Sequence, residues 1–233
     1  MSRQEDDVGL HALPIAVDHG GRELTVTPAL VETERGLVLI DAGPEGSLES
    51  LRTHVRSLGH ELADVWLVVV THHDADHAGG LAALLEHTDA VVATHREEAP
   101  FLTGERDPLG SDGDGDGDRY PPVEVDLELA GGVRIPTLAG PMEVVETPGH
   151  APGHVSLYFP ESGVLLAGDA LVADGTETLE GPKPEFTPDM DRAIESVGDL
   201  AGLEIDGVVC YHGGYAEAGT ERLEELHREL REK

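Results

Sequence analysis

Short apolar runs and stretches of mixed polarity follow one another along the chain, and their lengths distinguish strands from helices. Val65–Val70 is entirely apolar and predicts a strand buried on both faces. In residues 46–58, Leu48, Leu51 and Val55 recur about one helical turn apart, so this stretch predicts an amphipathic helix. By the same criteria the expected strands are residues 29–33, 37–41, 65–70, 90–93, 143–147, 155–159, 164–167 and 207–210, and the expected helices are 46–58, 79–86, 189–200 and 217–231.

The order of these elements predicts the fold class. Strands alternate first with helices and then with hairpin turns, and this order occurs twice. An α/β protein is therefore expected, with two sheets packed face to face and helices on the outer faces. A chain of 233 residues is long enough for one large domain and short for two ordinary ones, so residues 1–233 are expected to form a single domain.

The net charge of the chain indicates which class of protein it resembles and which kinds of partner are expected. The chain has 47 acidic residues and 15 basic ones, which gives a formal net charge of −32. This excess of acidic residues resembles that of the halophilic, acidic proteins of salt-loving archaea, in which cations screen the repulsion between carboxylates. It disfavours nucleic acids and anionic membranes as partners, because no basic patch is available to bind phosphate groups. A small-molecule substrate is therefore the expected partner, and the composition indicates no particular oligomeric state.

Two further features concern location and flexibility. The chain contains no apolar run of about 18 residues, and residues 2–7 are all polar. Neither a membrane span nor a signal peptide is expected, and a cytoplasmic location is predicted. Residues 105–122 contain a run of alternating Gly and Asp, which cannot form a core, so a flexible acidic insertion is predicted there.

Metal-ligating residue types cluster directly after the apolar run Val65–Val70. Five of the six residues from 72 to 77 are His or Asp, and Gly79–Gly80 follows them. In a loop that leaves a strand, residues 72, 74, 76 and 77 can turn to one side while 73 and 75 turn away. The candidate ligands of this loop are His72, Asp74, Asp76 and His77. The only cysteine, Cys210, ends a predicted strand and is interpreted as a core residue, so nitrogen and oxygen must hold any metal.

Three isolated residues, His150, Asp169 and His212, follow or end other predicted strands. Because strand ends often meet at one edge of a sheet, these residues and the loop ligands together predict one metal site. The seven side chains comprise four imidazoles and three carboxylates, a set that suits two first-row ions about 3.5–4 Å apart. Such a pair of ions lowers the pKa of a shared water from about 15.7 to near 7 and makes it a nucleophile.

These residues resemble the signature of the metallo-β-lactamase superfamily, which is His-x-His-x-Asp-His-x-Gly-Gly followed by a distant His, an Asp and a last His. The resemblance extends from the 37–43 stretch to His212-Gly213-Gly214. It implies a four-layer αββα sandwich of the metallo-β-lactamase type with two divalent metal ions at one edge. By matching positions, His72, Asp74 and His150 would bind the first ion, Asp76, His77 and His212 the second, Asp169 would bridge both, and Asp41 would hold the histidine loop.

One position departs from the signature, because Asp74 stands where most relatives carry a second histidine. A subset of bacterial and archaeal members with unassigned substrates shares this form. With three carboxylates and one hydroxide, the charge of two dications is cancelled. Zinc is the expected ion, and the additional oxygen ligand favours iron or manganese as alternatives.

The remaining histidines are interpreted by their settings. His95 follows a strand and His154 begins one, and both are candidates for lining the pocket or supporting the ligands. His73 is expected to point away from the ions. Ordinary surface positions are expected for His11, His54, His60, His87 and His227.

We therefore expect a hydrolase whose metal-bridging hydroxide attacks an ester, lactone, thioester or similar small substrate. Asp76 would be the catalytic residue that orients the hydroxide and passes its proton to the leaving group. The alternative is a diiron redox enzyme that reduces oxygen or nitric oxide. Relatives with that activity carry a carboxylate at the place of Asp74 and the same spacing of 18 residues between His150 and Asp169. That alternative requires a separate electron-donor protein.

Overall fold

The computed structural model describes residues 9–19, 22–107, 119–174 and 178–232. The described chain forms two compact units. The first lies within Met1–Ile15 and Pro28–Leu129, and the second within Ala16–Thr27 and Ala130–Lys233. The flexible insertion predicted for 105–122 falls mainly on 108–118, which lie outside the described residues. The single domain expected for 1–233 stays a prediction.

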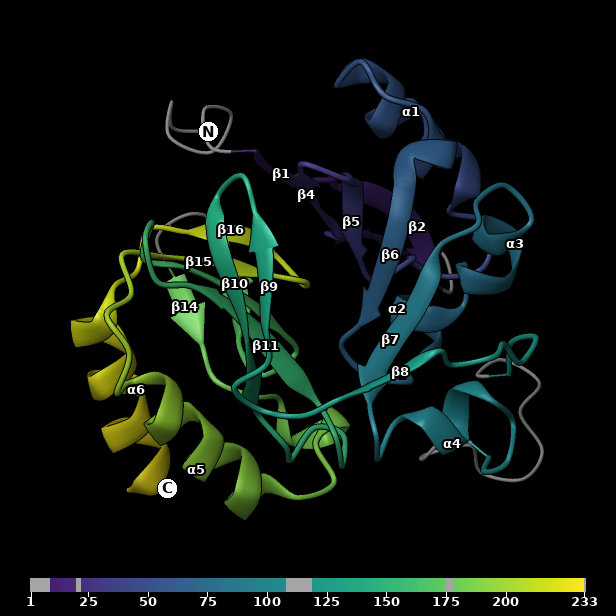
Figure 1. The fold of residues 1–233 in the computed structure, drawn as a ribbon. Coiled ribbons are helices and arrows are strands. Elements are labelled where there is room, and N and C mark those ends of the chain that lie inside the picture. The colour runs from purple at the N-terminus through teal and green to yellow at the C-terminus, as the bar shows by residue number, and fades with distance from the viewer. Residues whose placement is uncertain (1–8, 20–21, 108–118, 175–177, 233) are drawn as a thin grey trace. The chain divides into compact units, whose positions relative to one another are not determined.

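The first unit contains a mixed six-stranded sheet in the order β1-β4-β5-β6-β7-β8 (Figure 1). The pairs β1–β4 and β4–β5 are antiparallel, whereas β5, β6, β7 and β8 run parallel. Parallel strands place their carboxyl ends at one edge of the sheet, so the residues that follow β5, β6 and β7 lie near one another. The strands are β1 (Leu10–Ala12), β4 (Ala29–Thr33), β5 (Gly36–Ile40), β6 (Val65–Val70), β7 (Val91–His95) and β8 (Leu127–Leu129).

Helices of the first unit bury apolar stripes. α1 (Leu48–Ser57) buries Leu51 and Val55, and α3 (Leu81–Leu85) buries Leu81 and Leu84. Strand β6 is buried at every position except the half-buried Trp66, as its continuous apolar run predicts. The short helices of this unit are the 3₁₀ helix Leu62–Asp64, α2 (Ala75–Ala78) and α4 (Ala99–Leu102).

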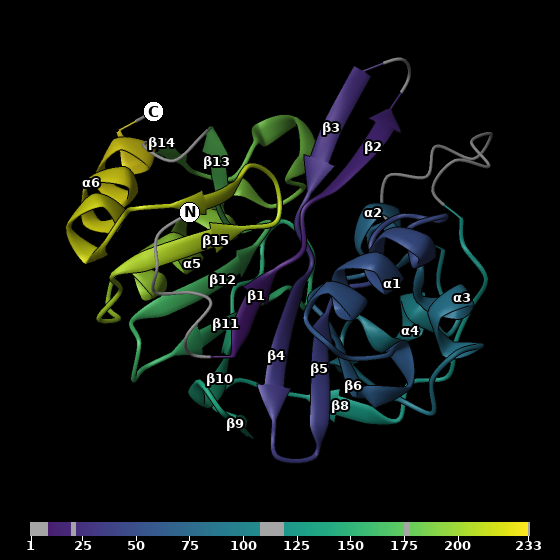
Figure 2. The same cartoon turned by 90° about the horizontal axis from the view of Figure 1, so that it is seen from above.

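The second unit contains a six-stranded sheet in the order β16-β15-β12-β11-β10-β9. Strands β12 and β15 run parallel, and the other neighbouring pairs are antiparallel. Two two-stranded ribbons, β2–β3 and β13–β14, belong to the same unit, and the first is clearly visible in Figure 2. The strands are β2 (Ile15–His19), β3 (Arg22–Val26), β9 (Arg134–Thr137), β10 (Gly140–Glu146), β11 (Val155–Phe159), β12 (Val164–Gly168), β13 (Val172–Asp174), β14 (Thr178–Glu180), β15 (Gly207–Cys210) and β16 (Gly214–Ala216).

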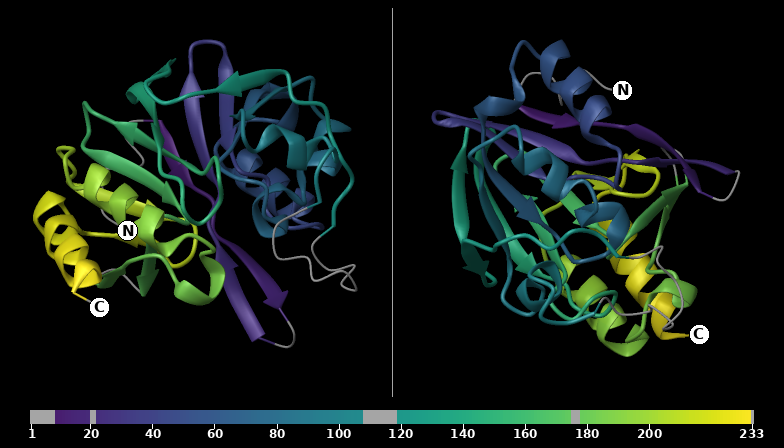
Figure 3. Two further views of the ribbon diagram at one scale, coloured as in Figure 1. Left: turned by 90° about the horizontal axis from the view of Figure 1, so that it is seen from below. Right: turned by 90° about the vertical axis from the view of Figure 1, so that its right-hand side faces the viewer.

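Two helices, α5 (Met190–Leu200) and α6 (Thr220–Arg231), lie side by side in the second unit (Figure 3). Val197 and Leu200 of α5 and Leu223 of α6 share one buried apolar cluster with strands β12 and β15. A short 3₁₀ helix, Pro184–Phe186, precedes α5. No helix in the described part of the chain is long and apolar enough to span a membrane.

The central elements agree with the sequence predictions. Strands 29–33, 65–70, 155–159 and 207–210 have the predicted bounds. The helix predicted for 79–86 is shorter, because Gly79 and Gly80 lie against the turn that follows β5 and α3 starts only after them. The pattern does not predict the edge strands and ribbons, because their short sequences mix polar and apolar residues and contain no continuous apolar run.

His11 corrects one expectation. It was expected at the surface, but it lies in β1 with only 8% of its area exposed. Its Nε2 is 2.9 Å from Oε1 of Glu32 on the neighbouring strand β4. The pairing of β1 with β4, which the sequence pattern does not reveal, explains this burial.

Candidate metal centre

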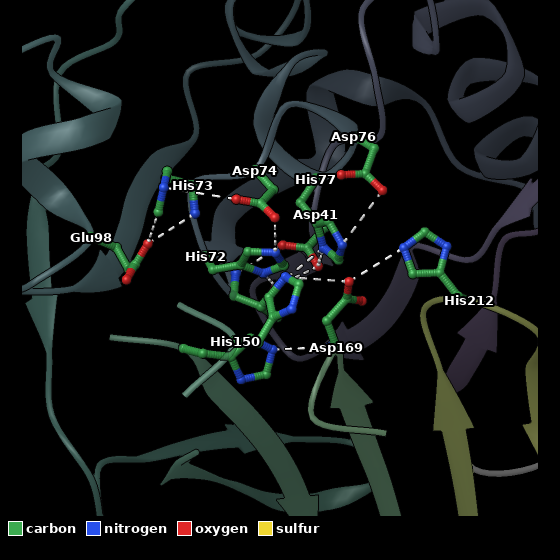
Figure 4. A network of polar contacts seen from close by, with 12 residues as sticks. Asp41, His72, His73, Asp74, Asp76, His77, Glu98, His150, Asp169 and His212 are labelled. Atoms are coloured by element: carbon green, nitrogen blue, oxygen red, sulfur yellow. Dashed lines mark hydrogen bonds and ion pairs between the residues drawn. The ribbon is translucent and has the colours of Figure 1, made fainter. Parts of the chain in front are cut away.

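The histidine loop, residues 71–77, leaves the carboxyl end of β6 and enters α2 in the first unit (Figure 4). Its turn is made at Asp74, whose carbonyl oxygen accepts a hydrogen bond from the amide of His77 at 2.9 Å. His72 and His77 are fully buried, whereas more than a third of each carboxylate side chain of Asp74 and Asp76 is exposed. The loop therefore presents two buried imidazoles beside two carboxylates that solvent reaches.

Asp41 determines which ring nitrogen of each buried histidine carries the hydrogen. Its Oδ2 accepts a hydrogen bond from His77 Nδ1 at 2.8 Å and another from Thr71 Oγ1 at 2.8 Å. Because Thr71 gives its hydroxyl hydrogen to Asp41, its oxygen accepts from Nδ1 of His72 at 3.1 Å. Nδ1 therefore carries a hydrogen in both imidazoles, and Nε2 is the nitrogen of each ring that would bind a metal ion.

The backbone around Asp41 is shaped for this contact. Asp41 has a φ of 60°, in the left-handed region that Asp adopts more readily than most residues. This conformation lets its Oδ1 accept from the amide of Thr71 at 2.8 Å.

A Cβ atom at Gly79 or Gly80 would lie 2.3 or 2.4 Å from a backbone carbonyl oxygen. Only glycine at positions 79 and 80 therefore allows the segment after α2 to pack this closely against neighbouring backbone.

Distances within the histidine loop fit shared coordination of an ion. Nε2 of His72 is 3.4 Å from Oδ2 of Asp74, and Nε2 of His77 is 3.9 Å from Oδ2 of Asp76. Two ligand atoms that each lie about 2.1 Å from a tetrahedral ion are about 3.4 Å apart. The two imidazole rings are also close, with centroids 4.0 Å apart. The nitrogen and oxygen donors of this loop therefore fit divalent first-row ions.

The second unit brings His150, Asp169 and His212 together from three separate segments (Figure 4). Asp169 follows β12, His212 lies just after β15, and His150 lies in the turn between β10 and β11. Oδ2 of Asp169 is 3.6 Å from Nε2 of His150 and 3.3 Å from Nε2 of His212. One carboxylate oxygen thus faces two imidazole nitrogens, at separations that match the same coordination geometry.

The backbone of His212 is fixed by neighbours from the same unit. Val26 forms an isolated antiparallel bridge with His212. The carbonyl oxygen of His212 accepts from the amide of Ala173 at 3.0 Å. Gly213 follows with a φ of 96°, and a Cβ there would lie 1.8 Å from the carbonyl oxygen of Ala173. The sharp turn that presents His212 therefore requires glycine at position 213.

A directed chain of hydrogen bonds supports Asp169. The hydroxyl of Ser156 donates to the carbonyl oxygen of Ala167 at 3.0 Å, so Ser156 can only accept from Thr147, at 3.0 Å. Thr147 then accepts from Nδ1 of His154 at 2.8 Å, and Nε2 of His154 accepts from the amide of Asp169 at 2.9 Å. His154 is therefore neutral, protonated at Nδ1, and bound to the backbone of Asp169.

Two other residues singled out by the sequence have clear settings. His95 is buried at the carboxyl end of β7, where its Nδ1 accepts from the amide of Glu97 at 3.3 Å, and its place in a pocket stays a prediction. Cys210 is completely buried in the core, as expected. Burial, with a smaller contribution from the charge of Asp169, raises the pKa of its thiol well above the usual range. The thiol therefore stays protonated and is a poor metal ligand.

The sequence interpretation gives no role to Thr71, which links Asp41 to His72, or to four further residues near the candidate ligands. Glu98 and Tyr120 contact His73 in the first unit, and Thr147 and Ser156 belong to the hydrogen-bond chain of the second. Glu98 offers a signal, since it stands three residues after the end of β7 at the same sheet edge as the histidine loop. The other three are ordinary in type and position and offer none.

The structure therefore groups the predicted residues within each unit. The first unit brings together Asp41, His72, Asp74, Asp76 and His77, and the second brings together His150, His154, Asp169 and His212.

Comparison with known proteins identifies relatives over most of the chain. The sequence profile described as "Metallo-beta-lactamase superfamily" matches residues 21–212. "Probable metallo-hydrolase YflN" of Bacillus subtilis is 33% identical over 209 residues, which cover 76% of this chain and 75% of that protein. A "Hydroxyacylglutathione hydrolase" of Cereibacter sphaeroides is 34% identical over 153 residues, which cover 66% of this chain and 50% of the relative. The chain thus spans about half the length of that relative.

A solved structure supports the fold class. Metallo-beta-lactamase family protein TTHA1429 from Thermus thermophilus matches with a TM-score of 0.76 and 26% identity, over 96% of this chain and 80% of that one. The predicted α/β fold of the metallo-β-lactamase type is therefore confirmed.

Proposed function

Because the chain is a metal-dependent hydrolase that belongs to the metallo-β-lactamase superfamily, we propose that it uses two divalent ions to hydrolyse a small ester, lactone or thioester. The observation that carries this proposal is that His72 and His77 present Nε2 beside the carboxylates of Asp74 and Asp76. Because Nδ1 of each ring is bonded to Thr71 or Asp41, Nε2 is the nitrogen oriented to bind an ion.

The proposal requires all seven candidate ligands for one pair of ions. The family profile supports this requirement, because its match from residue 21 to 212 includes both sets of ligands. Each set also has donor separations close to those of a coordinated ion. In the proposed site His72, Asp74 and His150 would hold the first ion, Asp76, His77 and His212 would hold the second, and Asp169 would be shared by both.

The residues of the chain then have distinct tasks in hydrolysis. When bound, the two ions lower the pKa of a water molecule to near 7 and polarise the substrate carbonyl. Asp76 orients the attacking water and carries its proton to the leaving alcohol or thiol as the acyl bond breaks. Asp41 keeps the two buried imidazoles from turning, and His154 holds the backbone of Asp169.

The relatives favour an acyl substrate, and the charge of the proposed site favours an uncharged one. Hydroxyacylglutathione hydrolases, named for an acyl group carried by glutathione, are among the relatives with 30% identity or more. The carboxylate of Asp74 removes the net positive charge that the loaded site would have with a histidine there. A neutral site attracts anions less, so uncharged esters and lactones are favoured over anionic substrates.

The test combines metal analysis with turnover. We expect about two equivalents of transition metal in protein purified without added metal, and turnover of at least one ester, lactone or thioester. Fewer than one equivalent would contradict the dinuclear site. An iron absorption band that dithionite bleaches, in a protein that turns over none of these substrates, would instead indicate the diiron redox enzyme.

Zinc is the proposed ion, because four of the seven proposed ligands are imidazoles. The three carboxylates also suit iron or manganese. Metal-free protein reloaded with each ion in turn, and assayed on the same substrate, ranks them. Higher activity with manganese or iron than with zinc would overturn the assignment of zinc.

We also propose that the acidic composition is an adaptation to high salt. With 47 acidic and 15 basic residues, like charges repel over about 30 Å at 0.01 M salt but only about 3 Å at 1 M. We expect the midpoint of thermal unfolding to rise steadily as KCl increases from about 0.1 M to about 2 M. A midpoint that does not change over this range would contradict the adaptation.

A further inference from the structure

The segment between β6 and α2 in the first unit carries two of the candidate ligands, His72 and Asp74. Residues 72–74 form neither helix nor strand, so the regular hydrogen bonds of a helix or sheet do not hold them. A side chain on such a segment keeps its direction only if other contacts hold the peptide groups beside it. The residue between the two ligands, His73, is 1% exposed and receives two contacts of this kind.

Glu98 holds the peptide group that joins His72 to His73 (Figure 4). Glu98 is fully buried directly before α4, and its Oε2 accepts a hydrogen bond from the backbone amide of His73 at 3.0 Å. The same oxygen is 2.5 Å from Nδ1 of His73, whose ring stacks on Phe101 with centroids 4.0 Å apart. A buried carboxylate is costly unless its oxygens are bonded, so the contact with this backbone amide is a specific arrangement.

Tyr120 holds the next peptide group, which joins His73 to Asp74. The phenol hydroxyl of Tyr120 donates to the carbonyl oxygen of His73 at 2.5 Å. Burial, with smaller contributions from the charges of Asp74 and Glu98, raises the pKa of Tyr120 above its ordinary value. The hydroxyl therefore stays protonated and keeps its hydrogen for this contact.

The two held peptide groups determine the directions of both ligand side chains. A peptide group is planar, so the backbone turns only about φ and ψ of each residue. The contact with Glu98 limits rotation about ψ of His72, and the contact with Tyr120 limits rotation about φ of Asp74. The Cα–Cβ bonds of the two ligands are thus fixed relative to each other.

We propose that Glu98 and Tyr120 are positioning residues that hold the backbone between His72 and Asp74 and so set the separation of these two ligands. This inference rests on the proposed function, in which both side chains bind the first ion. Nε2 of His72 and Oδ2 of Asp74 are 3.4 Å apart, which suits two donors on one tetrahedral ion. Ligands that are already held lose less conformational freedom on binding, so metal affinity depends on both contacts.

The first test removes only the hydroxyl of Tyr120. In Tyr120→Phe we expect the affinity for zinc, measured by competition with a chromophoric chelator, to fall about tenfold or more. The absorption spectrum of the cobalt-loaded variant should also shift, because the ligand separation is no longer held. The spectrum reports the geometry at the ion, which a general loss of stability would not change.

The matched control is Tyr158→Phe in the second unit. The hydroxyl of Tyr158 also donates to a backbone carbonyl oxygen, that of Glu204 at 2.7 Å. This variant loses the same kind of hydrogen bond, but we expect its zinc affinity to stay within about twofold and its cobalt spectrum to stay unchanged. Equal losses of affinity in the two variants would overturn the inference, and so would an unchanged affinity in Tyr120→Phe.

The second test concerns Glu98. In Glu98→Gln the amide oxygen can still accept from the backbone amide of His73, whereas Glu98→Met has a similar length and no acceptor. We expect Glu98→Gln to bind zinc about tenfold more tightly than Glu98→Met and to keep the cobalt spectrum of the unsubstituted protein. Equal affinities of the two variants would overturn the role of Glu98.

The variant Asp74→Ala separates this inference from the proposed function. If Asp74→Ala leaves metal affinity unchanged, Asp74 is not a ligand, and the proposed site and the inference both fail. If Asp74→Ala weakens metal binding but Tyr120→Phe and Glu98→Met do not, only the role of Glu98 and Tyr120 fails.

Discussion

The two sets of candidate ligands present the same kinds of donor atom, imidazole nitrogen and carboxylate oxygen, but different contacts hold them in place. In the first unit, four candidates lie within six consecutive residues, and one carboxylate, Asp41, fixes both imidazoles through direct and Thr71-mediated hydrogen bonds. In the second unit, three candidates come from three segments, and a chain of hydrogen bonds through His154 fixes the backbone of Asp169. One set is local in sequence, and the other is assembled by strand pairing.

This difference predicts different sensitivities. The histidine loop depends on one strand-turn-helix segment and on the side chain of Asp41, so a single substitution there should disturb several ligand atoms at once. The ligands of the second unit depend on the register of β11, β12 and β15, and many backbone hydrogen bonds together maintain that register. Single side-chain changes in the second unit should therefore have smaller effects.

The largest effect is expected in the histidine loop itself. Asp76→Asn keeps the size of the side chain but removes the carboxylate that we propose carries the proton. Turnover by metal-loaded protein should fall about 10²- to 10⁴-fold. Steady-state kinetics measures this, with Glu86→Gln as the control, since it removes an exposed charge from the same unit. A loss smaller than tenfold would contradict the role of Asp76.

A smaller effect is expected one step away from the ligands. Asp41→Asn suits the φ of 60°, but its amide offers a single acceptor oxygen where three hydrogen-bond donors of Thr71 and His77 meet. Metal affinity should fall about 10- to 100-fold in a chelator competition. Asp126→Asn is the control, because Asp126 also accepts from a backbone amide in this unit, that of Val92, away from the loop. An equal loss in both variants would contradict the specific role of Asp41.

The smallest effect is expected for His154 in the second unit. Since it acts through the backbone of Asp169, His154→Phe should weaken metal binding by about tenfold, the lower end of what supporting residues contribute. Nitrogen NMR of the metal-free protein should also show His154 protonated at Nδ1 and not at Nε2. A ring protonated at Nε2 would contradict the hydrogen-bond chain, and a loss larger than that of Asp41→Asn would reverse the comparison of the two units.

The sequence predicts the local part of the site better than its supports. The loop from His72 to His77 is recognisable because metal-ligating residue types are concentrated after a short apolar run whose length indicates a buried strand. His150, Asp169 and His212 are recognisable because each lies near the end or start of a predicted strand, although their grouping depends on pairings that no local pattern encodes.

The supporting residues escape prediction for a physical reason. Glu98 is identified by burial and by its bond to His73, and neither can be read from neighbouring residues. Thr147 and Ser156 matter only because adjacent strands place their hydroxyls 3.0 Å apart. The short strand β1 is missed in the same way, and with it the burial of His11.

The chain's only cysteine has a practical consequence for following the protein's motions. Cys210 has no exposed area, and its thiol is held in the unreactive protonated form at the end of β15. A maleimide or disulfide reagent can reach it only when this part of the second unit transiently opens. The labelling rate under native conditions would thus report how often β15, the strand that leads to His212, separates from its neighbours, and no second thiol would contribute to the signal.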